Sequence, residues 1–152
     1  MEAAGAVMAA IIVIAGVAAV VIRSRYVVVT VLGRSMEPTY KPGQQLLVRR
    51  CRLASIRHGQ VVVVASPSDW AVPAEEAAGA GGSWMIKRVV GLPGDRMDRF
   101  PSLPGTEGAT IVPPGHLVLF GDNTEHSHDS RHVGFLPADG LLGVVTRLIR
   151  TE

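Results

Sequence analysis

Hydrophobic residues fall into one long run near the N-terminus, followed by short runs that polar turns separate. The long run covers residues 3–22 and contains no charged residue. The later runs are rich in Val, Ile and Leu and are bounded by Gly, Pro, Asp or Ser, which is typical of strands joined by turns. They cover residues 26–32, 45–50, 60–66, 84–92, 116–121 and 140–149.

This pattern predicts an all-β domain after the first run, because no later stretch keeps a helical period over about ten residues. The expected strands would pack into a sandwich or a partly closed barrel. Residues 67–83 and 98–114 are rich in Pro, Gly and Ala and are predicted to be loops on the rim. The chain therefore divides into an N-terminal segment, residues 1–25, and a β-domain, residues 26–152.

The first run is predicted to be a single transmembrane helix, because twenty apolar residues in a helix would span about 30 Å. A cleaved signal peptide is less consistent with the run, since Glu2 precedes it and no basic start is present. A buried core helix would need more covering protein than the remaining chain supplies. Arg23 and Arg25 follow the run, and by charge alone they would hold the β-domain in the cytoplasm. A long translocated domain overrides that rule, so charge leaves the orientation open.

Composition excludes several classes of protein. The chain has 152 residues and a formal net charge of +2, which gives no reason to expect nucleic-acid binding. Its single cysteine, Cys51, excludes an internal disulfide and a cysteine metal cluster.

Lys87 is unusual in its context, because the chain has thirteen arginines and only two lysines. Strand alternation places Lys87 on the same face as Met85 and Val89. An ammonium buried there is expected to have a lowered pKa, so a neutral amine is one interpretation. The other interpretation is a lysine whose stem lies along apolar surface while its head reaches water.

The stretch "GRSMEPTY", residues 33–40, breaks off after an apolar strand and contains Ser35. A serine in such a turn often only bonds nearby backbone. Beside a neutral Lys87, however, the Ser35 hydroxyl could be activated as a nucleophile. Gly33 would let the backbone approach a substrate carbonyl closely.

Four motifs in order resemble those of the type I signal peptidases, the membrane-anchored serine and lysine endopeptidases. They are "SMEPT" (35–39), "PGQQLLVRR" (42–50), "KRVVGLPGD" (87–95) and "GDNTEHSHDSRHVGFLP" (121–137). The resemblance covers nearly all of the chain. It implies a predominantly antiparallel signal-peptidase-like β-fold that follows the transmembrane helix.

The resemblance also implies the roles of individual residues. Ser35 would be the acylated nucleophile and Lys87 the general base, with Ser127 orienting the lysine amine. Asp129 and Arg131 would brace this segment. Some family members carry a hydroxyl donor at the position of Gly33, so here the oxyanion would be held largely by main-chain N–H groups.

The segment around Ser127 also contains three histidines. His126, His128 and His132, with neighbouring carboxylates, could ligate zinc or nickel. No further metal signature accompanies them, and histidines on polar loops are usually solvated. The sequence therefore predicts no metal and no cofactor.

The resemblance implies a membrane-bound serine endopeptidase that cleaves signal peptides or propeptides after small residues. Its partners would be precursor proteins in extended conformation and the lipid bilayer, with the catalytic domain on the exterior side of the cell membrane. Three alternatives remain. The first is a maturation protease dedicated to one precursor, such as that of nickel superoxide dismutase. The second is a non-catalytic anchored domain that binds peptides. The third is a relative of the self-cleaving repressors, although the chain lacks their DNA-binding helical domain.

Overall fold

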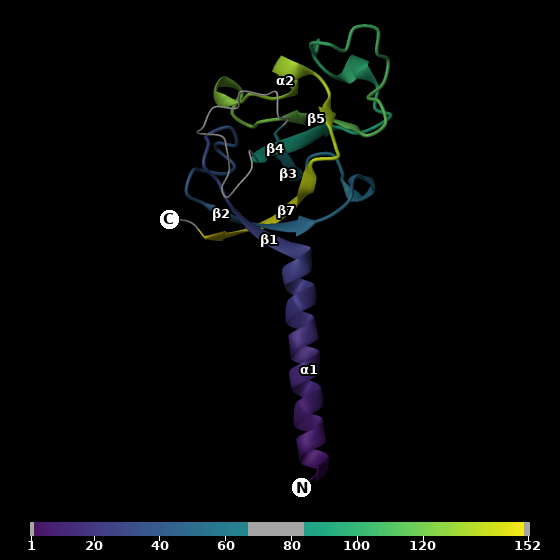
Figure 1. The fold of residues 1–152 in the computed structure, drawn as a ribbon. Helices are drawn as coiled ribbons and strands as arrows, with labels where there is room; N and C mark the ends of the chain where they lie inside the picture. The colour runs from purple at the N-terminus through teal and green to yellow at the C-terminus, as the bar shows by residue number, and fades with distance from the viewer. Residues whose placement is uncertain (1, 67–83, 151–152) are drawn as a thin grey trace.

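One long helix and a seven-stranded sheet make up the computed structural model, which describes residues 2–66 and 84–150. Helix α1 (Glu2–Arg25) leads directly into the first strand and projects away from the β-domain (Figure 1). The strands are β1 (Tyr26–Thr30), β2 (Gln45–Arg50), β3 (Val61–Ala65), β4 (Trp84–Gly91), β5 (His116–Phe120), β6 (Leu136–Pro137) and β7 (Leu141–Arg150). The predicted loop over residues 67–83 lies outside the described residues.

The sheet has the order β1-β2-β7-β3-β4-β5-β6, and each neighbouring pair is antiparallel. The prediction of an all-β, mainly antiparallel domain is thus confirmed, and the six predicted strands are present with shifts of one or two residues at their ends. The short elements that were not predicted include strand β6 and helix α2 (Ser130–Val133). Their lengths of two and four residues are too short to leave a hydrophobic period.

Helix α1 confirms that the N-terminal run is helical, but its predicted crossing of a bilayer is not supported. Within the part of the chain that the structure describes, no helix meets the length and hydropathy of a membrane-spanning segment.

The core lies on both faces of the sheet, so strand β3 has four consecutive buried valines. One cluster includes Val62, Met85, Val89, Leu117 and Val144. The cluster on the other face includes Val31, Met36, Leu46, Val48 and Ile86. A sheet buried on both faces gives continuous apolar strands rather than alternating ones. This arrangement holds β4 rigidly between two packed layers.

A third, smaller cluster anchors the segment between β4 and β5. Leu103 and Val112 are buried against Val118 of β5. An isolated bridge between Arg96 and Ile111 closes the base of this segment, which we call the 96–111 lobe. It lies at the end of the domain farthest from α1 (Figure 1).

Candidate active site

Ser35 lies in the turn that follows β1. The chain leaves the sheet after Val31, whose N–H donates to the Gln44 carbonyl at 2.9 Å. A backbone hydrogen bond from Tyr40 N to the Met36 carbonyl, 2.9 Å long, closes the turn. Met36 is 1% exposed and packs in the cluster with Val31 and Ile86, so burial of its side chain fixes the neighbouring serine. Ser35 itself is 6% exposed, while Gly33 is half-buried in the preceding bend.

Lys87 lies in the middle of β4 and is fully buried. Its Cα partner on β3 is Val62, and it shares a face with Met85 and Val89, as strand alternation predicted. The interpretation in which its head reaches water is therefore wrong. The Nζ atom donates a hydrogen bond to Ser127 Oγ over 3.0 Å.

Ser127 connects the amine of Lys87 to a buried carboxylate. Its hydroxyl donates to Asp129 Oδ2 at 2.6 Å. Asp129 is fully buried and forms a bidentate ion pair with Arg131, with 3.0 Å between Nε and Oδ1 and 2.6 Å between Nη2 and Oδ2. The structure thus brings together four residues to which the resemblance gave linked roles: Lys87, Ser127, Asp129 and Arg131.

The environment of Asp129 keeps it ionised. Burial raises the pKa of its carboxyl, but hydrogen bonds from Arg131, from Ser127 and from the backbone N–H of Gly121 outweigh burial and lower the pKa to about 2. The same pairing raises the pKa of Arg131. An ionised carboxylate can only accept, so Ser127 must donate its proton to Asp129 and accept from Lys87.

Residues 121–123 join this network to the nucleophile turn, a role that was not predicted for them although they begin the fourth motif. The N–H of Asn123 donates to the Ser35 carbonyl at 2.9 Å, and its side-chain amide donates to the Arg34 carbonyl at 3.2 Å. A Cβ added at Gly121 would lie 2.2 Å from Ser127 Oγ and 2.6 Å from the Ser35 carbonyl oxygen. Ser35 and Ser127 therefore approach Gly121 so closely that only glycine fits, which brings Ser35 and the Lys87 amine into one neighbourhood.

A second ion pair fixes the other side of the turn. Arg88 points to the opposite face from Lys87, and its Nε donates to Asp122 Oδ1 at 2.8 Å. The Thr39 hydroxyl also donates to Asp122. Burial raises the pKa of Asp122, but the hydrogen bonds from Arg88 and Thr39 lower it overall. The ion pair of Arg88 with Asp122 could have been predicted from the sequence, because one motif carries the arginine directly after Lys87 and another carries the aspartate directly after Gly121.

The histidines stand at the border of this network. His128 and His132 stack with ring centroids 4.9 Å apart, and His132 Nδ1 accepts from the Asp129 N–H at 3.4 Å. His126 is exposed and lies beside Asn123. Among the described residues, no group of three or more His, Cys, Asp or Glu side chains is arranged to hold a metal ion.

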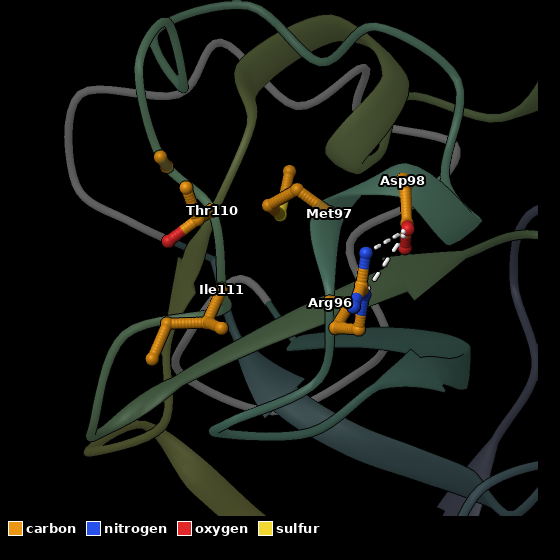
Figure 2. Close-up of a pocket in the computed structure, with 6 residues that line it drawn as sticks. Arg96, Met97, Asp98, Thr110 and Ile111 are labelled. Atoms are coloured by element: carbon orange, nitrogen blue, oxygen red, sulfur yellow. Dashed lines mark hydrogen bonds and ion pairs between the residues drawn. The ribbon is translucent and has the colours of Figure 1, made fainter.

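A pocket of about 460 Å³ lies in the 96–111 lobe (Figure 2). Its lining residues are Arg96, Met97, Asp98, Ala109, Thr110 and Ile111. Arg96 pairs with Asp98 at 2.6 Å, and none of the predicted catalytic residues lines this pocket. The catalytic candidates therefore lie in the network around Ser127 and not in this pocket.

Comparison with known proteins agrees with this geometry. The family model described as "Signal peptidase, peptidase S26" matches residues 4–99 and 97–149. The chain is 30% identical to a probable signal peptidase I-2 of Synechocystis, over 94% of this chain and 70% of that protein. It is 33% identical to the mitochondrial inner membrane protease subunit 1 of Mus musculus, over 72% of this chain and 61% of that protein. Signal peptidase I V of Bacillus subtilis is 28% identical over 75% of this chain and 80% of its own length.

The chain thus spans about three fifths of the length of the mouse mitochondrial relative and somewhat more of the bacterial relatives. The family match, in contrast, covers nearly all of this chain and includes each candidate catalytic residue. The chain belongs to the signal peptidase family, peptidase S26, and is by that membership a serine peptidase, a hydrolase.

Proposed function

We propose that the protein is a membrane-attached endopeptidase in which Ser35 is the nucleophile and Lys87 the general base. The observation that carries this proposal is the complete burial of Lys87 with its amine bonded to Ser127. Burial disfavours the ammonium form, and a neutral amine has a lone pair that can take a proton. The hydrogen bond to Ser127 orients one N–H of the amine, and in this account the lone pair of the amine turns toward Ser35 when substrate binds.

The reaction would proceed through an acyl-enzyme. Ser35 Oγ attacks the substrate carbonyl carbon while Lys87 Nζ takes the hydroxyl proton. The resulting oxyanion would be held by the backbone N–H of Ser35, which donates to no acceptor among the described residues. Lys87 then gives its proton to the leaving amine as the peptide bond breaks. Water attacks the ester in the same way, and its cleavage releases the acid and returns the proton to Ser35.

No hydrogen bond joins the Ser35 hydroxyl to another described residue. Catalytic hydrogen bonds are often long in the free enzyme and shorten when substrate binds. In this account, substrate binding brings the hydroxyl to the lysine amine.

The edge of β4 offers a place for an extended substrate. Residues 84–87 pair with β3, whereas pairing with β5 begins only at Arg88. In the described part of the chain, the other edge of residues 84–87 therefore has no strand partner. An extended peptide added there would direct alternate side chains toward the enzyme, so the first and third residues before the cut would enter pockets. The resemblance adds that both pockets take small side chains such as Ala.

Attachment to the membrane is part of the proposal. Large apolar side chains of α1, including Ile11, Ile14 and Val20, are more than half exposed, and lipid would cover them. Two relatives are named as signal peptidases and one as an inner membrane protease, which supports the same location. A single-pass anchor with the β-domain on the exterior side stays a prediction. A reporter fused after residue 152 tests it, and a cytoplasmic signal would contradict it.

The function is tested by cleavage of a membrane-inserted precursor that has Ala at the first and third positions before the cut. Wild type should cut after the small residue, and Ser35→Ala should lose the activity. Ser102→Ala, a change at an exposed serine in the 96–111 lobe, should cut normally. Cleavage that persists in Ser35→Ala, or that is lost only on adding a chelator, would overturn the proposal. A panel of precursors then separates a general signal peptidase from a protease dedicated to one substrate.

A further inference from the structure

Charges are distributed very unevenly over the molecule. No acidic residue occurs between residues 38 and 68 or between residues 140 and 151, although Lys41 and six arginines lie in these two stretches and Arg23 and Arg25 follow the apolar run. In the candidate site and in the 96–111 lobe, by contrast, carboxylates lie beside arginines: Asp129 pairs with Arg131, and Asp98 pairs with Arg96.

The sheet register gathers five of these arginines at the end of the domain from which α1 emerges. Arg25 is followed by Tyr26, whose partner on β2 is Arg49. Arg50 comes next on β2, and Arg147 of β7 lies opposite Leu47. We call Arg23, Arg25, Arg49, Arg50 and Arg147 the arginine collar. Its strands β1 and β2 and the end of β7 lie beside the top of α1 (Figure 1).

The guanidinium groups of the collar have no protein partner among the described residues. No ion pair or side-chain hydrogen bond involves any of the five. Four of them are exposed, and Arg49 is half-buried. Exposed apolar side chains lie beside them: Val28 is 52% exposed and Ile149 is 47% exposed. A cationic rim with apolar residues between its charges suits the interface of a bilayer, where lipid phosphates meet hydrocarbon.

We propose that the arginine collar binds the headgroups of anionic phospholipids and so holds the β-domain down on the membrane surface. The inference rests on the proposed attachment of α1, because that attachment places headgroups at the C-terminal end of the helix. Arginine forms bidentate hydrogen bonds with phosphate oxygens, and each basic group near an anionic surface strengthens binding about fivefold. The collar also gives Arg23 and Arg25 a role on whichever side of the membrane the domain lies.

The single cysteine supplies the readout. Cys51 follows Arg50 directly, is partly exposed and is free. The full chain is reconstituted into vesicles of phosphatidylcholine alone, or of phosphatidylcholine with about 30% phosphatidylglycerol. Flotation reports the attachment of α1, and the rate of modification by a membrane-impermeant maleimide reports how closely the collar approaches the lipid.

For wild type we expect modification to be at least about fivefold slower on the phosphatidylglycerol vesicles. About 0.5 M salt should remove most of this difference, since it shortens the Debye length to a few ångströms. The double variant Arg49→Gln/Arg50→Gln should lose most of the lipid dependence, and Arg147→Gln, which is more distant from Cys51, should weaken it. The matched control Arg96→Gln/Arg99→Gln, in the remote lobe, should behave as wild type. Loss of folding is distinguishable, because it would speed modification on both kinds of vesicle.

Suppose that both proteins float with the vesicles but that anionic lipid slows the modification of Cys51 equally in wild type and in Arg49→Gln/Arg50→Gln. This result would overturn the role of the arginine collar while leaving the attachment of α1 intact. Failure to float with either vesicle would overturn the attachment and the collar with it. Neither result would bear on whether Ser35→Ala loses precursor cleavage relative to wild type, so failure of the collar and failure of the catalytic proposal remain distinguishable.

Discussion

At the residue scale, the site depends on the direction of a few hydrogen bonds. Asp129 is ionised, so Ser127 donates to it and accepts from Lys87. Lys87 could be singled out from its place in an apolar strand, whereas Ser127 and Asp129 were identified only through motif resemblance, because spacing along the chain says nothing about hydrogen-bond direction. The burial of Lys87 could be expected from strand alternation, whereas the closeness of Gly121 to Ser127 and Ser35 depends on how two loops meet.

Ser127→Ala should lower kcat about tenfold to a hundredfold with little change in KM, because the lysine amine would lose the acceptor that orients it. The test is to measure kcat and KM by steady-state kinetics for wild type, for Ser127→Ala and for the control Ser102→Ala. An equal loss in both variants, or a change confined to KM, would contradict an orienting role for Ser127.

Asp129→Asn should lower the free energy of unfolding by about 2 kcal/mol at pH 7. The folded-state pKa of about 2 lies below the ordinary 3.8, so ionised Asp129 stabilises the fold above pH 3.8. That contribution is lost as the pH falls from 3.8 through 2. Chemical denaturation of both proteins between pH 7 and pH 2 should therefore show their difference shrinking with acid. A difference that stays constant would mean that Asp129 does not act through its charge.

Gly121→Ala should both destabilise the protein and reduce activity, because the added methyl would overlap Ser127 Oγ and the Ser35 carbonyl oxygen. Gly16→Ala, where an added Cβ meets nothing within 4 Å, is the matched control. Thermal melting and activity of the two variants make the test. Normal activity in Gly121→Ala would show that Ser35 and Ser127 need not approach each other at this position.

At the scale of the elements, the site is built where β4, the nucleophile turn and residues 121–131 meet. Short apolar runs bounded by turn residues predicted the strands well, since each of these strands is a short run rich in Val, Ile and Leu that ends at a turn. They could not predict strand order, because the pairing of β2 and β3 with β7 joins segments far apart in the chain. The two-residue β6 and the four-residue α2 depend on contacts with β5 and not on their own sequences.

Asp122→Asn tests the connection between these elements. It should weaken the charged hydrogen bonds from Arg88 that fix the nucleophile turn to β4, and so reduce kcat while leaving the fold largely intact. Asp98→Asn breaks an exposed ion pair with Arg96 and should change little. Limited proteolysis at the turn provides a second readout. Equal kinetics in the two variants would contradict this role of Asp122.

At the scale of the whole molecule, α1 leads into the end of the β-domain that carries strands β1 and β2, and the rest of the domain lies beyond them (Figure 1). The helix and the excess of arginine near it were visible in the sequence. The gathering of arginines from α1, β2 and β7 became visible only with the sheet register. An enzyme held in this way would meet a precursor where the apolar segment of that precursor leaves the bilayer.

The central claim is that Lys87 acts as a base and not as a fixed positive charge. The most direct measurement compares kcat/KM for precursor cleavage by wild type, Lys87→Ala and Lys87→Arg, with thermal melting to verify folding. Arginine stays protonated in proteins and cannot take the Ser35 proton. The account predicts that both variants lose at least about a thousandfold in kcat/KM, and that wild-type activity falls as acid protonates Lys87. A folded Lys87→Arg variant with activity within about tenfold of wild type would contradict the account.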